Sequence, residues 1–155
     1  MVGLRNSHDK KFPVGVSFGT FVCDNLAFSG DHVIKRKHTL NLKRDLPGLI
    51  GEIVEPLAIQ REGQKRQFDR YQATALSDRA ADHFILSLYR QGIFGIQTVP
   101  DVLREWDTPS HDWGDKTVFR LFNAATFALT GKVAEKPSLT RDIHKTLDLA
   151  CEEIA

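Results

Sequence analysis

The spacing of the hydrophobic residues changes near residue 40, and this change limits the folds that the chain can adopt. Up to that point apolar residues recur at every second position, as in the run from Phe12 to Phe18, which is the period of a β-strand. After it they recur about every 3.6 residues, first in a stripe between Leu46 and Leu57. Strands followed by helices predict an α+β fold, with a small antiparallel sheet of three to four strands over residues 2–39 covered by four to five helices over residues 45–153.

The length and composition are typical of one globular domain. The chain has 155 residues, of which 41% are hydrophobic and 26% charged, and no stretch resembles a linker between domains. We therefore expect a single domain over residues 1–155, with a basic strand-rich part at 1–44 and a helical part at 45–155.

Turn residues divide the strand-rich part. Gly19 ends the run that begins at Phe12, the pair Asp24-Asn25 predicts a turn or bulge, and Ser29-Gly30-Asp31 predicts a second turn. The last strand runs from His32 to Thr39, where neither face is purely apolar, as in an edge strand.

Helix boundaries are marked by capping residues. Ser77 is a suitable N-cap for a helix through Arg90, and Gly92 is a suitable left-handed stop. A short helix follows Thr98, another spans Lys116 to Leu129, and a last one follows Ser138. Pro56 predicts either a kink in the first helix or its end near Glu55.

Basic residues are concentrated in the strand-rich part. Residues 1–44 contain eight Lys or Arg against three Asp, a net charge of +5, whereas the remainder has a net charge of −4. This asymmetry indicates a polyanionic partner, although a solvated edge strand has a similar pattern. The candidate nucleic-acid contacts are Arg5, Lys10, Lys35, Arg36, Lys37, Lys43 and Arg44.

A second set of polar residues raises the possibility of an enzyme. His8 and Asp9, with Asp24 or His38, could serve a hydrolase or nuclease, but Ser7 and His8 are neighbours on a strand and point to opposite faces. We favour a structural role for these residues over a catalytic one. We also predict no metal and no cofactor, because no HxH or HxxxH spacing occurs.

The segment around residues 106–126 combines two Trp residues with polar side chains. Arg120, Asn123 and Thr126 recur at helical spacing after the loop that carries His111 and Trp113. We expect these polar residues to hold the loop through buried hydrogen bonds, with a cleft lining as the alternative.

Targeting signals and disulfides are not indicated. The chain has no apolar run long enough to span a bilayer and no signal-peptide core, which predicts a cytoplasmic protein without a membrane partner. Cys23 and Cys151 lie far apart without a CxxC partner, so two reduced thiols are expected.

Several strings resemble one family. VGLRNSHDK, FVCDNLAFSG, KRKHT followed by RDLP, and EWDTPSH with TVFRLFNAAT are similar to phage- and plasmid-borne prokaryotic proteins classified only as a domain of unknown function, over Val2 to about Leu149. Members are often longer at the N-terminus, so the resemblance implies a short form or a truncated chain. It implies a mobile-element setting and no particular activity.

The leading hypothesis is a non-enzymatic nucleic-acid-binding accessory factor in DNA replication, recombination or defence evasion. The order of strands and then helices is also similar to that of single-strand annealing proteins. The two alternatives are the hydrolase or nuclease described above and a protein that binds and inhibits a host factor.

Overall fold

The computed structural model describes residues 2–5, 14–22, 25–36, 41–136 and 138–154, and gives side-chain surroundings for most residues between 41 and 152. Three strands come first: β1 (Val2–Arg5), β2 (Val14–Val22) and β3 (Asn25–Arg36). The helices that follow are α1 (Leu42–Ala73), α2 (Asp78–Arg90), α3 (Val99–Asp107), α4 (Val118–Ala128), α5 (Lys132–Glu135) and α6 (Ser138–Ile154), with the short 3₁₀ helix η1 (Ile96–Thr98) between α2 and α3.

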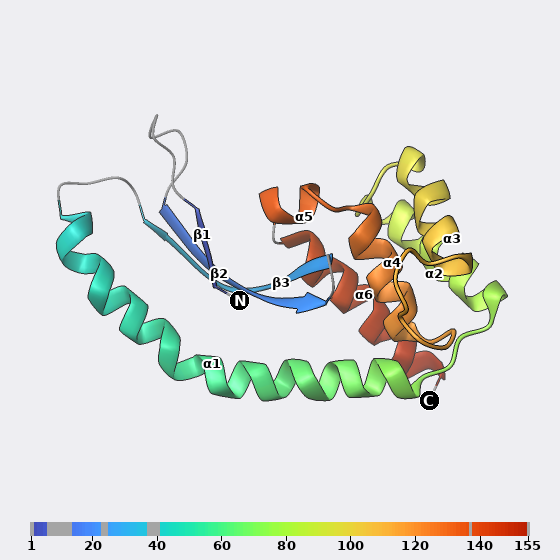
Figure 1. Ribbon diagram of the computed structural model, residues 1–155, viewed down its shortest axis with the longest axis horizontal. Helices are drawn as coiled ribbons and strands as arrows, with labels where there is room; N and C mark the ends of the chain where they lie inside the picture. Colours follow the sequence, from blue (N-terminus) through green and yellow to red (C-terminus); the bar gives the residue numbers. More distant parts are fainter. Residues whose placement is uncertain (1, 6–13, 23–24, 37–40, 137, 155) are drawn as a thin grey trace.

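The core that the structure describes lies within the helical part. Its largest fully buried side chains include Trp106 of α3, Tyr71 of α1 and Phe122 of α4. The last half of α1 packs with α2, α3, α4 and α6 into one group of helices, which we call the helical body (residues 64–152; Figure 1). The inward positions expected on α2 and α4, such as Ile85 and Leu121, are buried there as the helical spacing predicts.

The predicted α+β fold, in which helices cover an N-terminal sheet, is wrong because the structure is mostly helical. Helices bury their apolar stripes chiefly against one another. Where burial is described, every core residue belongs to a helix or to a connection between helices, from Tyr71 to Cys151. Alternation in the sequence marks an extended segment, but it does not show whether that segment organises a core.

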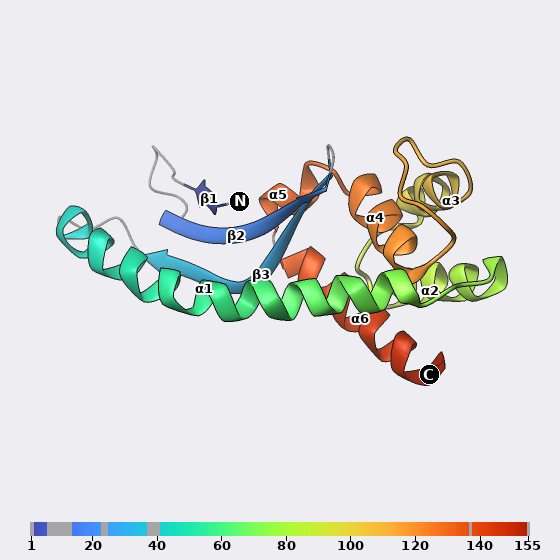
Figure 2. The same cartoon turned by 60° about the horizontal axis from the view of Figure 1, so that its bottom comes forward.

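The strands pair in the order β1-β2-β3, and both pairings are antiparallel. Gly19 does not end a strand, because β2 continues to Val22. Ser29-Gly30-Asp31 is not a turn between strands either: β3 passes through it, and the pairing with β2 shifts register between Val16 and Phe18. Between the pairings of Val16 and Phe18, β3 has three residues more than β2, so the pairing is irregular at this point. The two views agree that α1 runs along the sheet while the remaining helices gather at one end of it (Figures 1 and 2).

Helix α1 is continuous through Pro56. It contains 32 residues, about 48 Å of helix at 1.5 Å per residue. Its axis changes direction in the first half (Figure 1), as expected where a proline inside a helix removes one main-chain N–H donor. Of the two alternatives that the sequence allowed, one long kinked helix is the correct one.

Ser77 and Gly92 bound α2 as the sequence predicts, whereas Thr98, which the sequence suggests as the cap of α3, precedes that helix without a side-chain cap hydrogen bond. The hydroxyl of Ser77 accepts a hydrogen bond from the Ala80 N–H at 3.3 Å, and Gly92 has a φ of 71°. The short helix α5 was not expected from the sequence. No helix in the described part of the chain is both long enough and apolar enough to cross a membrane.

Candidate nucleic-acid interface

Two of the predicted nucleic-acid contacts lie directly across the sheet from one another. Arg5 of β1 and Lys35 of β3 both pair with Gly15 of β2, so the three residues form one row. Arg36 pairs with Val14 in the adjacent row. Neighbouring strands lie about 4.8 Å apart, which places the main chains of Arg5 and Lys35 about 10 Å from each other. The sheet therefore brings together basic positions that are 30 residues apart in the sequence.

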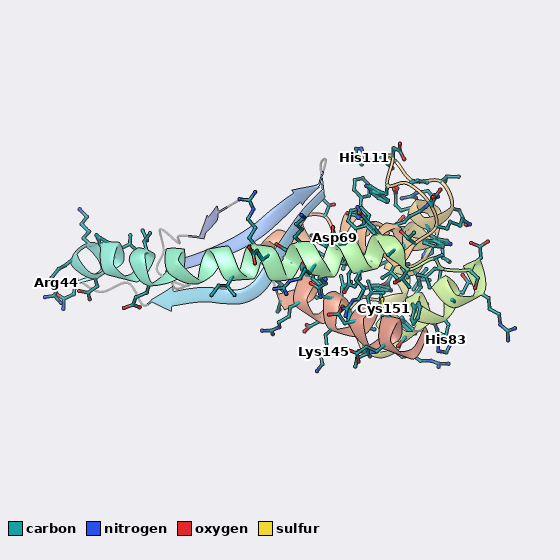
Figure 3. All side chains as sticks on the ribbon, turned by 90° about the horizontal axis from the view of Figure 1, so that it is seen from below. Arg44, Asp69, His83, His111, Lys145 and Cys151 are labelled. Carbon is teal, nitrogen blue, oxygen red and sulfur yellow. The ribbon has the colours of Figure 1, made fainter. Side chains whose placement is uncertain are left out.

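Lys43 and Arg44 begin α1 a short distance along the chain from Arg36. Both side chains are exposed, and the Arg44 Nε donates a hydrogen bond to Asp45 Oδ1 at 2.9 Å. Figure 3 shows Arg44 at the end of α1 that is remote from the helical body. The first turn of a helix presents unpaired main-chain N–H groups and a partial positive charge. Lys43 and Arg44 add two positive charges there, of which the Asp45 carboxylate offsets one, so the turn keeps a net positive charge.

The remaining candidates from the sequence lie outside the described residues. This applies to Lys10 and Lys37 among the nucleic-acid contacts, and to His8, Asp9, Asp24 and His38 among the catalytic ones. Of the seven predicted contacts, the structure thus places Arg5, Lys35 and Arg36 by their strand pairing, and Lys43 and Arg44 by their position on α1.

Arg120 holds the loop between α3 and α4, which confirms for this residue the expectation stated for Arg120, Asn123 and Thr126. Its Nε donates to the Trp106 carbonyl at 2.8 Å, its Nη2 to the Asp107 carbonyl at 3.1 Å, and its Nη1 to the Gly114 carbonyl at 3.2 Å. Asn123 and Thr126 donate to main-chain carbonyls of their own helix, those of Phe119 and Phe122. The positive charge of Arg120 therefore stabilises a loop.

Two charged residues hold the Trp106 side chain in place, one at the start of α2 and one just before α4. Its indole N–H donates to Asp78 Oδ1 at 3.0 Å, and the Lys116 ammonium lies 5.4 Å from its ring centre while also bonding to Asp78. The hydrogen bonds from Lys116 and Trp106 hold the pKa of the Asp78 carboxyl below its ordinary value. These charged groups satisfy one another within the helical body.

Sequence reasoning missed a buried polar cluster where α1 meets α6. The Tyr71 hydroxyl donates to the His144 main-chain carbonyl at 3.1 Å and lies 3.2 Å from His144 Nδ1. One turn further along α6, Asp148 accepts from Gln67 Nε2 at 2.6 Å and from Arg70. The i, i+4 spacing of His144 and Asp148 on an otherwise apolar stripe was the signal available in the sequence.

Burial controls protonation in this cluster. It lowers the pKa of His144 to about 4 and raises the pKa of Tyr71 above its ordinary value, the latter with help from the Asp148 charge. Burial likewise raises the pKa of the Cys151 thiol, which fits the expectation of a reduced, buried cysteine. At neutral pH the imidazole, phenol and thiol are therefore all uncharged.

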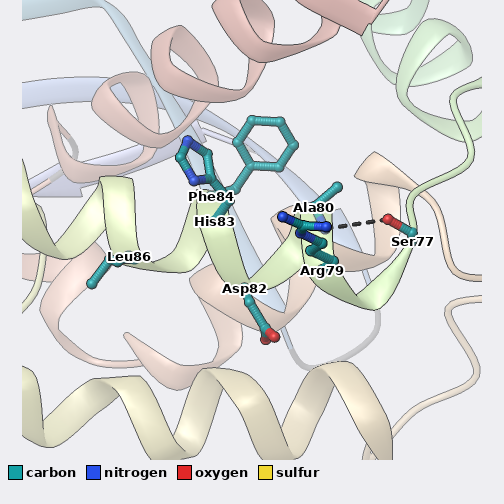
Figure 4. Close-up of a pocket in the computed structure, with 7 residues that line it drawn as sticks. All are labelled: Ser77, Arg79, Ala80, Asp82, His83, Phe84 and Leu86. Atoms are coloured by element: carbon teal, nitrogen blue, oxygen red, sulfur yellow. Dashed lines mark hydrogen bonds between the residues drawn. The ribbon is translucent and has the colours of Figure 1, made fainter.

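A shallow pocket lies on α2 and is lined by seven residues of one segment, drawn in Figure 4. Arg79, Asp82 and His83 are its charged or titratable groups. Its described lining comes from a single helix and its N-cap Ser77, so it does not bring together groups from different elements as an active site usually does. Within the described part of the chain, no three His, Cys, Asp or Glu residues lie close enough to hold a metal ion.

No family model, curated protein or solved structure matches this chain.

Proposed function

We propose that the protein binds nucleic acid through the basic end of its sheet. The observation that supports this most is the row in which Arg5 and Lys35 lie on either side of Gly15. Phosphate neutralisation by Lys and Arg supplies most sequence-independent affinity for nucleic acid. The glycine between the two cations adds no side chain in the middle of the row, which favours the approach of a sugar-phosphate backbone.

The start of α1 extends this surface. Arg36 is followed after a short connection by Lys43 and Arg44, which are exposed at a helix N-terminus. Lys43 lies seven residues after Arg36, and seven residues of chain span at most about 25 Å, so these cations lie within reach of the same stretch of nucleic-acid backbone. Together they supply several phosphate contacts in one region of the molecule.

The resemblance to phage and plasmid proteins gives this proposal its setting. A non-enzymatic DNA-binding accessory factor fits a mobile element, in which replication, recombination and defence evasion all require contacts with DNA. The cytoplasm, where these processes take place in a prokaryote, is the proposed location.

Fluorescence anisotropy with labelled single- and double-stranded oligonucleotides tests the proposal. The affinity should fall as salt rises, with a slope in log Kd against log salt of about 0.7 per phosphate contact for a single strand and about 0.9 for a duplex. A Lys35/Arg36/Lys37 to Ala triple variant should bind more weakly and with a smaller slope. Absence of binding to either oligonucleotide at low salt, or binding that the triple variant leaves unchanged, would contradict the proposal.

A further inference from the structure

His144 occupies the place where α1, α4 and α6 meet. The residue is only 7% exposed, and its ring stacks on Phe122 of α4 with the ring centres 4.2 Å apart. From α1, the rings of Phe68 and Tyr71 lie 5.6 and 5.7 Å away. One imidazole of α6 therefore contacts both helices against which α6 packs at this point.

The hydrogen bonds around the ring suit only its neutral form. Because the Tyr71 phenol donates to the His144 carbonyl, the ring N–H is assigned to Nδ1, which donates to the phenol oxygen. The other nitrogen, Nε2, is buried and has no hydrogen-bond partner among the described residues. As an acceptor Nε2 carries only a lone pair, whereas protonation would place a charged donor there without an acceptor.

The charged groups near the ring do not offset that cost. The charge of Asp148 favours the protonated ring but is outweighed by burial, and this carboxylate is already paired with Arg70 and Gln67 of α1. On α4 the residue in contact with the ring is the apolar Phe122. Just after α2, Gln91 accepts a hydrogen bond from Thr146 of α6, and both of these side chains are uncharged. Strand β3 and helix α5 also pack against α6; the titratable or charged residues in their sequences are Asp31, His32, Lys35, Arg36, Lys132 and Glu135.

We propose that His144 makes the contact between α1 and the rest of the helical body a proton-sensitive joint, which is closed while the imidazole is neutral and opens when it takes up a proton. The chain passes from the strands into the helical body only through α1. An opened joint therefore loosens the covalent route to the strand-rich part, while β3 keeps its direct packing against α4, α5 and α6. This inference does not depend on the proposed binding of nucleic acid.

The size of the effect follows from proton linkage. A histidine in an unfolded or opened segment has a pKa near 6.5, whereas burial holds that of His144 at about 4 in the closed joint. The proton thus binds about 300-fold more weakly to the closed state, and the opening equilibrium rises by up to this factor as the pH falls. The sign is fixed: the stabilising effect of a neutral His144 is complete above pH 6.5 and decreases between pH 6.5 and 4.

Hydrogen–deuterium exchange of the full chain, corrected for the pH dependence of the intrinsic exchange rate, tests the joint. Between pH 6.5 and 5, amides of α1 from residue 67 to 73 should exchange at least about tenfold faster, whereas those of α3 should change much less. A His144→Phe variant keeps a planar ring and leaves the carbonyl acceptor for Tyr71, so its exchange should be independent of pH in this range. The matched control is His83→Phe, because His83 is exposed on α2, and it should behave like the wild type.

Equal acceleration in the wild type and His144→Phe, or uniform acceleration that includes α3, would overturn the proposal. A second measurement covers the case in which His144→Phe does not fold. NMR titration of the wild-type imidazoles should show His144 remaining neutral, with its proton on Nδ1, down to about pH 5. A His144 signal that titrates above pH 6 would contradict the joint regardless of the variant.

Discussion

The strand-rich part and the helical body differ in their balance of positive and negative charge. In the helical body Arg70 pairs with Asp148, Lys116 with Asp78, and Arg120 with three main-chain carbonyls. In residues 1–44 eight basic residues face only three acidic ones, so most of those charges have no acidic partner within their own segment. The cations named in the helical body stabilise the fold, whereas for those of the strand-rich part we propose a polyanionic partner.

The largest effect is expected at Trp106, which anchors the helical body. Replacing it with Ala removes a fully buried ring together with its hydrogen bond to Asp78. The free energy of unfolding should fall by about 3–5 kcal/mol, as for other buried aromatic residues. Urea denaturation monitored by circular dichroism measures the change.

Leu149→Ala is the control for that variant, because Leu149 belongs to the same body but is 55% exposed. Its cost should stay within about 0.5 kcal/mol. If both variants lost the same amount of stability, the core around Trp106 would not be organised as described.

The next effect concerns Arg120, whose charge is assigned to loop stabilisation. Arg120→Ala leaves the carbonyls of Trp106, Asp107 and Gly114 without this donor and should cost about 2–3 kcal/mol. Amide exchange in residues 107–116 should rise more than in α6. Nucleic-acid affinity under conditions where the variant is folded should stay within about twofold of the wild type, and a large loss would show that cations of the helical body take part in binding.

A smaller effect is expected at the start of α2. Ser77→Ala removes the acceptor for the Ala80 N–H and should lower the free energy of unfolding by about 1 kcal/mol. Ser77→Asp retains an N-cap acceptor and should be close to the wild type. A Ser77→Asp variant as unstable as Ser77→Ala would mean that the cap contributes nothing at this position.

The sequence predicted the local structure of the helical body well because its signals are local. The N-cap Ser77, the stop at Gly92 and the inward positions of α2 and α4 each depend on a few neighbouring residues. The α+β class was wrong because strand periodicity says nothing about which elements bury the core. The continuity of β2 through Gly19 was missed because pairing with a neighbouring strand overrides a glycine's preference for turns.

In the candidate site too, the sequence identified residues but not their arrangement in space. Charge counting identified Arg5 and Lys35, but their alignment through Gly15 depends on the strand register, which the sequence does not specify. In the buried cluster, Tyr71 lies more than 70 positions from His144 and Asp148. Only the packing of α1 against α6 brings these residues together, so the sequence could not reveal the contact.

The comparison between the two parts can be tested directly by removing two positive charges from each of them. An Arg5→Ala/Lys35→Ala double variant and an Arg141→Ala/Lys145→Ala double variant have the same net charge, and Arg141 and Lys145 are exposed on α6. In anisotropy titrations over a range of salt concentrations, the first variant should lose most of the affinity for single-stranded DNA, with a salt slope smaller by about 1.4. The second should bind like the wild type; equal losses in both variants would contradict the account.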